Sequence, residues 1–256
     1  MTKLIALLPI ICVAVVASKA IDDSKDSMIS EDIQKLAYQI EASKLTAPTK
    51  IRIAQGLEDM KAAPGEHITL HCMVLSTPSS VFHWEHNGIR VQEDSNVNIH
   101  ERMMNIGKEV VGDGTISSFY TIPCVNANST GIYKCIAFNG HGTVESSAKV
   151  TVEGKPTECV SNDKTAPKII TITGIRLQEN GRVATLNCRA DKPAKFEWTF
   201  KGKPIDMNDG RFSVLSYGDL VISNISWSDM GDFTCYARNK YGEDHAEAML
   251  FPTKPN

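Results

Sequence analysis

Several features that mark enzymes and metal proteins are missing from this sequence. It contains no Cys-x-x-Cys pair, so zinc-ribbon and thioredoxin-like sites lack their main requirement. Gly-x-Ser-x-Gly, P-loop and Gly-x-Gly-x-x-Gly motifs are also missing, and the paired carboxylates lie in polar stretches. We therefore expect no catalytic residue, no bound cofactor and no metal site.

The sequence also has no large excess of positive or negative charge. The 27 basic and 30 acidic residues give a net charge of −3, whereas nucleic-acid binding needs clustered Lys and Arg to neutralise phosphates. Apolar residues make up 42% of the chain, and its 256 residues are enough for about two domains. The composition predicts a globular protein that binds no nucleic acid.

A long apolar run occurs only at the N-terminus. Lys3 precedes the apolar residues 4–17, and small residues follow them. This order is typical of a secretory signal peptide over residues 1–20, which is cut before Ile21 or, alternatively, after Ala17. A buried core helix is the other interpretation of the run.

The rest of the chain offers no candidate for a membrane span. No later apolar run approaches the length of about 18 residues that a membrane helix needs, and residues 252–256 are polar. We therefore expect no membrane anchor. Together with the signal peptide, this predicts a secreted, extracellular protein.

The cysteine count fits an oxidising compartment. Of the seven cysteines, Cys12 falls within the signal peptide. The other six are Cys72, Cys124, Cys135, Cys159, Cys188 and Cys235. An even number in a secreted chain indicates three disulfides, although the count alone leaves the pairing open.

The second half of the chain repeats a pattern of the first half. A Trp follows a Cys in each half, at Cys72 and Trp84 and again at Cys188 and Trp198. A Gly-x-aromatic-x-Cys motif comes next, and then Ala-x-Asn-x-x-Gly, and both recur at an offset of 100 residues. This internal repeat predicts two domains of the same kind.

Alternating apolar residues predict strands that bury one face. Residues 68–72 and 184–188 both alternate in this way and both end at a Cys. Turn sequences at 139–140 and 240–242 precede further alternating runs. Two sheets that bury such faces against each other, with a Cys from each sheet and a Trp beside them, form a β-sandwich.

These motifs resemble those of the immunoglobulin superfamily, once in each half. The residues that carry the resemblance are Cys72, Trp84, Tyr133 and Cys135 in the first half, and Cys188, Trp198, Asp229 and Cys235 in the second. The resemblance implies an all-β fold of two tandem I-set-like β-sandwiches. It also implies the disulfides Cys72–Cys135 and Cys188–Cys235.

The expected domain organisation follows from these motifs. We expect a signal peptide at residues 1–20, a partly helical N-terminal segment at 21–47, immunoglobulin-like domain 1 at 48–153, a linker at 154–166 and immunoglobulin-like domain 2 at 167–252. In the N-terminal segment Ser30 can cap a helix whose apolar stripe includes Ile33, Leu36 and Ile40. Such a helix packs on a domain, binds a partner or is only marginally stable alone.

Strand direction in the immunoglobulin fold predicts the third disulfide. Cys124 lies near the end of strand E, and Cys159 follows strand G. Because strands B, E and G run in one direction, both cysteines emerge at one pole of domain 1, which we expect to face domain 2. A Cys124–Cys159 bond would then restrain the linker and limit the angles of domain 2. Free thiols or a bond between two chains are the alternatives.

The turn before strand F departs from the family pattern in both halves. Tyr133 can form the tyrosine corner, but Phe233 in the second half has no hydroxyl. The second half keeps Asp229, for which Arg211 is the candidate partner. The first half has Ser129 at that position and loses the ion pair.

The first half also contains an insertion. Trp84 and Ile122 are 38 residues apart, whereas Trp198 and Ile222 are 24 apart. The 14 additional residues fall within Val91–Ile116, where we expect longer edge hairpins or a short helix. This segment is either a candidate binding surface or a solvated loop.

Two sequons and three histidines complete the candidate sites. Asn128 and Asn224 begin Asn-x-Ser/Thr sequences in or near predicted turns, so we expect both to carry glycans. His67, His71 and His83 fall on outward faces of strands from opposite sheets. They are interpreted as solvated surface residues because no tetrahedral ligand set can form.

The whole chain resembles the secreted two-immunoglobulin-domain (zwei-Ig, zig) proteins of nematode neurons. The shared features are its length, the signal peptide, two domains without an anchor, and residues 122–124 with the companion Cys159. The resemblance implies that the chain binds an extracellular or cell-surface protein and helps to maintain the position of axons and neurons. Alternatively, secreted two-domain proteins of insects that it also resembles imply a soluble carrier that sequesters an insulin-like peptide hormone.

Overall fold

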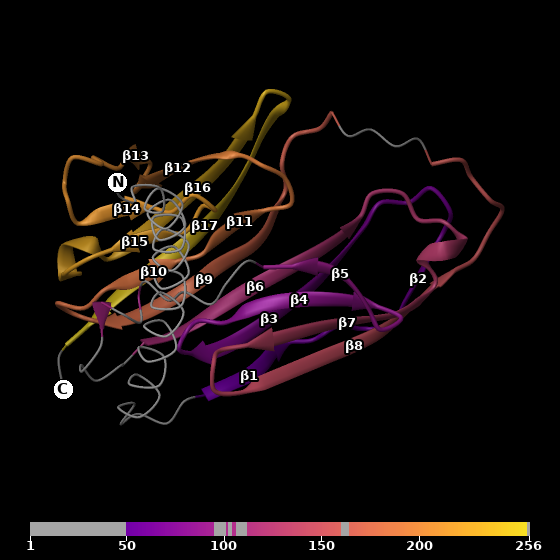
Figure 1. Ribbon diagram of the computed structural model, residues 1–256, viewed down its shortest axis with the longest axis horizontal. Coiled ribbons are helices and arrows are strands. Elements are labelled where there is room, and N and C mark those ends of the chain that lie inside the picture. The colour runs from indigo at the N-terminus through magenta and orange to yellow at the C-terminus, as the bar shows by residue number, and fades with distance from the viewer. Residues whose placement is uncertain (1–49, 95–100, 102–103, 106–111, 160–163, 255–256) are drawn as a thin grey trace, which may run out of the picture.

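The computed structural model describes residues 50–94, 101, 104–105, 112–159 and 164–254 (Figure 1). The expected signal peptide and the helical segment at 21–47 lie outside the described residues. The strands of domain 1 are β1 (Lys50–Gln55), β2 (Met60–Ala62), β3 (Ile68–Thr77), β4 (Val81–His86), β5 (Ile89–Glu93), β6 (Gly112–Ile122), β7 (Gly131–Phe138) and β8 (Thr143–Val152). The described residues are nearly all in β-strands and their connections, as the sequence predicts.

Domain 2 repeats this arrangement. Its strands are β9 (Ile169–Glu179), β10 (Ala184–Leu186), β11 (Cys188–Ala190), β12 (Lys195–Phe200), β13 (Lys203–Pro204), β14 (Phe212–Val214), β15 (Leu220–Ile222), β16 (Gly231–Asn239) and β17 (Gly242–Thr253). Short 3-10 turns, η1 (Ala127–Ser129) and η2 (Trp227–Asp229), precede β7 and β16.

Each domain encloses a core around one disulfide and one tryptophan. In domain 1 the Cys72–Cys135 bond joins β3 to β7, and Trp84 lies opposite Cys135 in the β4–β7 register. The Trp84 indole is fully buried and donates its Nε1–H to Ser118 Oγ at 2.9 Å. Burial also alternates along β3, so the one-sided strand predicted from residues 68–72 is confirmed.

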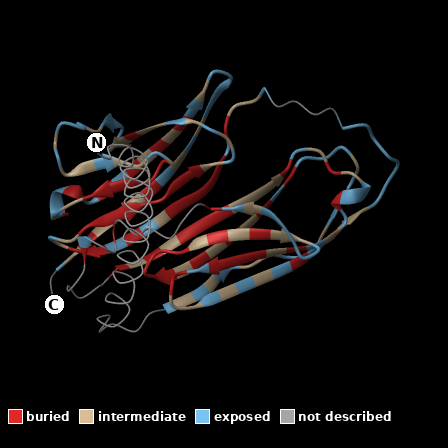
Figure 2. Ribbon diagram, in the orientation of Figure 1, coloured by how far each residue is buried: buried red, intermediate tan, exposed pale blue. Residues whose placement is uncertain are grey.

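The core of domain 2 follows the same plan. The Cys188–Cys235 bond crosses it, and Trp198 lies opposite Cys235 in the β12–β16 register. Trp198 donates its Nε1–H to the carbonyl oxygen of Gly218 at 2.9 Å. Figure 2 shows buried residues in red along the strands of both domains.

A single sheet of nine strands runs through both domains. Its main order is β1-β3-β6-β9-β17-β16-β12-β13, and β11 also pairs with β9. The junction is the antiparallel pair of β6 and β9, with Ser118 opposite Thr171 and Asp113 opposite Leu177. Domain 2 therefore lies beside domain 1, and the two share backbone hydrogen bonds (Figure 1).

The place that β9 occupies belongs to strand D in an immunoglobulin sandwich, beside strand E. The described part of the insertion contributes no strand there, so the edge of β6 is open to domain 2. Close approach of the two strands requires glycine at Gly114. A Cβ atom at that position would lie 2.9 Å from the carbonyl oxygen of Ile175.

Two described residues of the insertion, Glu101 and Asn105, are buried against domain 2. The Arg176 guanidinium, 1% exposed, donates to Glu101, to Ser79 Oγ at 2.9 Å and to Gln178 Oε1 at 2.8 Å. Asn105 exchanges two hydrogen bonds with the backbone of Val183. The interpretation of the segment as a solvated loop is thus wrong for Glu101 and Asn105, because their side chains close the junction between domains.

A second buried contact lies at the other end of the junction. Asp94 of domain 1 accepts hydrogen bonds from the Thr171 hydroxyl at 2.9 and 3.0 Å and from the Phe82 amide at 3.2 Å. Burial raises the pKa of Asp94 to about 6, against smaller opposing effects of the Arg189 guanidinium and the Thr171 hydroxyl.

The third disulfide joins Cys124 to Cys159, with a Cα–Cα distance of 5.8 Å. The pole that it closes does not face domain 2, which corrects the expected arrangement. Domain 2 packs along the edge of β6 rather than at the end of the strand. The angle between the domains is therefore set by the β6–β9 pairing, and the disulfide only restrains the start of the linker.

The turns before β7 and β16 are closed in different ways. Tyr133 donates its hydroxyl to the carbonyl oxygen of Ser129 at 3.0 Å, which forms the tyrosine corner. In domain 2 the Arg211 guanidinium donates to both oxygens of Asp229, at 2.9 and 3.2 Å. The Arg211–Asp229 pair predicted from the sequence is therefore confirmed.

We predict that Glu101→Ala destabilises the protein by about 3–5 kcal/mol, because it leaves the buried Arg176 charge without its carboxylate. The matched control is Glu93→Ala, which removes an exposed partner of Arg90 and should change stability by about 0–1 kcal/mol. Urea unfolding measures both. Equal effects of the two changes would contradict a buried ion pair at the junction.

Asp94 should make folding stability depend on pH. Because its folded pKa lies above the unfolded value of 3.8, the folded protein binds the proton more tightly, and stability rises as pH falls from about 7 to about 4. The gain is up to about 3 kcal/mol. Asp94→Asn should remove it, and Glu58→Gln, an exposed carboxyl, should not. Urea unfolding at pH 7 and pH 4.5 gives the comparison, and identical pH slopes for wild type and Asp94→Asn would refute the role.

Candidate recognition surface

The outer face of strands β4, β5, β7 and β8 carries both charged and apolar side chains among the described residues. Along β7 the buried Tyr133, Cys135 and Ala137 point to the core, so the residues between them point outward. We call this surface the domain 1 face and define it by the outward residues Val81, His83, Glu85, Arg90, Glu93, Ile132, Lys134, Ile136, Phe138, Glu145 and Lys149.

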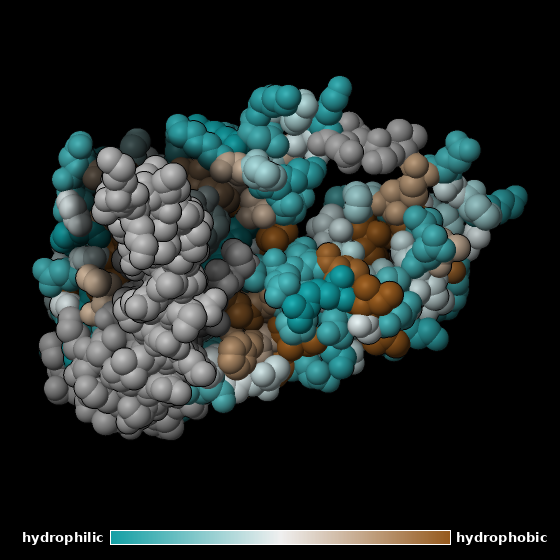
Figure 3. Space-filling view, viewed as in Figure 1, coloured by the Kyte–Doolittle hydropathy of each residue, from teal (hydrophilic) through white to brown (hydrophobic). Residues whose placement is uncertain are grey.

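Charges on the domain 1 face are arranged in pairs. Lys134 Nζ lies 3.0 Å from Glu145 Oε1, and an Arg90 guanidinium nitrogen lies 2.8 Å from Glu93 Oε1. Apolar side chains stand among these pairs, and Ile132 is 47% exposed. Figure 3 likewise shows hydrophobic side chains of domain 1 scattered among hydrophilic ones on the visible face. Isolated apolar anchors inside a polar rim are typical of protein-recognition surfaces.

Three exposed apolar side chains lie at or in the insertion. Ile89 is 71% exposed and Val91 is 38% exposed, both on β5, and Met104 is 48% exposed. They are close to the segment that the sequence marks as a candidate binding surface. Among the described residues of that segment, Val91 and Met104 are exposed apolar side chains, whereas Glu101 and Asn105 are buried.

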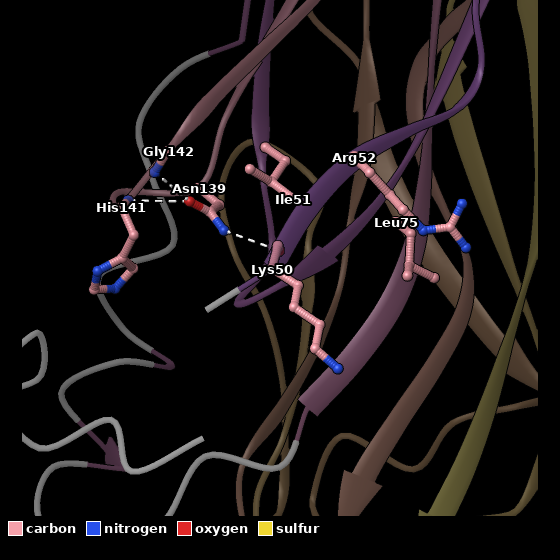
Figure 4. A pocket seen from close by; sticks show the side chains of 7 residues that line it. All are labelled: Lys50, Ile51, Arg52, Leu75, Asn139, His141 and Gly142. Carbon is pink, nitrogen blue, oxygen red and sulfur yellow. Dashed lines mark hydrogen bonds between the residues drawn. The ribbon is translucent and has the colours of Figure 1, made fainter. Parts of the chain in front are cut away.

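A cationic pocket lies where β1 meets the turn between β7 and β8. Lys50, Arg52 and His141 line it together with Ile51, Leu75, Asn139 and Gly142 (Figure 4). Asn139 fixes the turn by donating to the carbonyl oxygens of Lys50 and Thr77 at 3.2 and 3.1 Å. Sequence reasoning missed this pocket because its residues come from three separate parts of the chain, β1, Leu75 of β3 and the β7–β8 turn, and form no motif.

A shallow groove crosses the junction on the outer face of the nine-stranded sheet. Domain 1 contributes His67, Thr69, Phe119 and Thr121, and domain 2 contributes Lys168, Ile169, Asp244, His245 and Ala246. Next to it His71 stacks on Phe119 at 4.6 Å and bonds Ser117 Oγ at 3.0 Å. His71 is therefore half-buried, which corrects its interpretation as a solvated surface residue, and this burial lowers its pKa.

The other candidate sites keep the positions that the sequence suggests. Asn128 in η1 and Asn224 before η2 are both exposed. The described residues include no group of three or more His, Cys, Asp or Glu placed to hold a metal ion. In the same part of the chain, no helix combines the length and the apolar character needed to cross a membrane.

Comparison with known proteins places this fold in a family. The immunoglobulin I-set domain matches residues 51–152, and a second immunoglobulin domain model matches residues 166–239. Zwei Ig domain protein zig-3 of Caenorhabditis elegans is 43% identical over 245 residues, which cover 96% of this chain and 98% of that protein. The chain belongs to the Zwei Ig domain proteins. The relative zig-4 is also 43% identical, over 85% of this chain and 86% of its own length.

A solved structure shares the fold of both domains. The crystal structure of neural ectodermal development factor IMP-L2 matches with a TM-score of 0.61 at 22% identity, over 82% of this chain and 97% of that one. None of these named proteins points to a catalytic family, and immunoglobulin domains of this kind are recognition modules.

We predict that Asn128 and Asn224 both carry N-linked glycans after secretion. Both side chains are exposed, and each is followed by the required hydroxyl residue two positions later. Asn128→Asp and Asn224→Asp should each remove one glycan, and Asp suits the left-handed backbone at Asn224, where φ is +50°. Mass spectrometry before and after glycosidase treatment measures the loss.

The control for the glycan prediction is Asn208→Asp, because Asn208 is not part of a sequon. This variant should retain both glycans. A wild-type protein whose mass does not change with glycosidase would contradict the prediction at both sites.

Proposed function

We propose that this chain is a secreted extracellular recognition protein that helps to maintain the position of axons and neuronal cell bodies through protein–protein contacts. The observation that carries the proposal is the 43% identity to zig-3 across nearly the full length of both chains. Identity of that extent, without large gaps in coverage, favours a shared mode of action. The maintenance role itself is the one that the family resemblance implies.

The domain 1 face supports recognition of a protein surface. It combines the partly exposed anchors Ile132 and Phe138 with charged pairs such as Lys134–Glu145. Because β6 and β9 hold the domains in one arrangement, the face is presented in a fixed orientation to domain 2. Binding then avoids the entropy cost of ordering two mobile domains.

A second candidate is the soluble carrier of an insulin-like peptide. The observation in its favour is the exposed apolar set Ile89, Val91 and Met104 at the insertion, since a carrier buries an apolar hormone surface. Their exposed positions are compatible with a peptide ligand, and the adjacent charged pair Arg90–Glu93 could border it.

The test uses the glycosylated, biotinylated protein on living neurons of the animal from which it comes. We expect saturable surface binding, and Ile132→Glu should weaken it at least tenfold, because a buried charge at an anchor position costs about 1.4 kcal/mol or more. The matched control is Met207→Glu in domain 2, since Met207 is 48% exposed and Ile132 is 47% exposed. The control should bind as the wild type does.

Two outcomes distinguish the candidates. If neurons do not bind the protein but an insulin-like peptide forms a one-to-one complex that Val91→Glu abolishes, the carrier function is correct. For the maintenance role, depletion of the protein after development should displace axons that had grown to their normal positions. Axons that keep their positions after depletion would contradict it.

A further inference from the structure

The outer face of the nine-stranded sheet carries an apolar patch that crosses the domain junction. We call it the junction patch and define it by Leu75, Ile175, Leu177, Met230, Met249 and Phe251. Ile175 is 44% exposed, Leu177 38% and Met230 40%. The second half of β9 reverses the usual pattern of a strand, in which apolar side chains are buried and polar ones face solvent. Here Arg176 and Gln178 are buried, while Ile175 and Leu177 face solvent.

The register places these residues in rows across the sheet. One row runs from Arg52 on β1 through Leu75 on β3, Thr115 on β6, Ile175 on β9 and Met249 on β17 to Asp232 on β16. Side chains on one face of neighbouring strands are about 5 Å apart, so the row is continuous. Figure 4 shows Arg52 and Leu75 side by side at its start.

Charge distinguishes the two ends of this row. Arg52 and Lys50 are exposed cations at the β1 end, and Asp232 is an exposed anion at the β16 end. The middle is centred on the β6–β9 junction and carries the apolar Leu75, Ile175 and Met249, with Thr115 of β6 between Leu75 and Ile175. Asp113, the acidic group nearest the middle, already accepts a hydrogen bond from the Thr77 hydroxyl at 2.7 Å.

We propose that the junction patch binds a second copy of this chain in a two-fold dimer. A two-fold axis in the plane of the interface, parallel to the strands and between β6 and β9, reverses the order of the row in the facing copy. Arg52 of one copy then lies over Asp232 of the other, and Leu75 lies over Met249. A surface that is positive at one end, apolar in the middle and negative at the other end is complementary to itself under this operation.

The dimensions suit such an interface. Six strands at a spacing of about 4.8 Å give a row about 24 Å long, which is the scale of a standard interface of about 800 Å² per partner. Two sheets pack face to face with their strands about 30° apart, and the long Arg52 side chain can span the resulting offset at the ends of the row. The proposal does not rest on the function proposed above.

The first test is the oligomeric state of the glycosylated, secreted chain by analytical ultracentrifugation. The wild type should be dimeric at a concentration of about 10 µM, and Ile175→Glu should weaken the dimer at least about tenfold. The matched control is Ile132→Glu, at a residue of similar exposure on β7 in the other sheet. It should remain a dimer, and circular dichroism checks that both variants fold.

The second test is a charge exchange. Arg52→Glu and Asp232→Arg should each weaken the dimer several-fold, and the double variant should restore it to within about threefold of the wild type. Within one chain these residues are about 24 Å apart, at opposite ends of the row, so they cannot compensate each other intramolecularly. Restoration therefore requires contact between two copies.

Three outcomes would overturn the proposal. The first is a wild-type protein that stays monomeric at about 100 µM. The second is a dimer that Ile132→Glu disrupts and Ile175→Glu does not. The third is a monomer whose patch is used otherwise, either crosslinked to residues 21–47 of the same chain or bound to an insulin-like peptide that Ile175→Glu releases.

Discussion

The backbone pairing of β6 with β9 is the interaction on which the rest of this structure depends. An unpaired strand edge exposes a row of N–H and C=O groups, and a protein must cover it or risk non-specific pairing. Domain 1 does not cover the edge of β6 with a strand D of its own within the described residues; the first strand of domain 2 covers it. The buried side chains of Glu101, Asn105 and Asp94 then seal the two ends of that pairing.

The elements predicted from the sequence were those with local signals. Alternation in residues 68–72 and the repeated motifs indicated the two sandwiches correctly. The partners of the core disulfides and the Arg211–Asp229 pair followed from the resemblance to the immunoglobulin superfamily that those motifs carry. The junction depends on residues about 60 positions apart, and no local pattern encodes such a contact. One indirect signal of the junction was present in the sequence. Gly112 and Gly114 lie two positions apart in a strand, where glycine indicates a close approach of another backbone.

The other indirect signal is the inverted polarity of β9. A strand that points Arg176 and Gln178 inward and Ile175 and Leu177 outward is unexpected for an isolated domain, and it makes sense only beside a polar partner such as Glu101. Surfaces such as the cationic pocket at Lys50 and His141 were beyond sequence reasoning for a related reason. Their members meet only after β1 and the β7–β8 turn are placed in space.

The two turns that precede β7 and β16 differ in a way that ionic strength can reveal. The tyrosine corner of domain 1 is a neutral hydrogen bond, whereas domain 2 relies on the Arg211 guanidinium, which is 32% exposed, and the buried Asp229 carboxylate. At 1 M salt the screening length shrinks to about 3 Å, which weakens attraction between partly solvated charges and leaves a neutral hydrogen bond almost unchanged. At 1 M salt the turn before β16 should therefore open more often than the turn before β7. Amide hydrogens around Ser226 would then exchange with solvent sooner than those around Asn126.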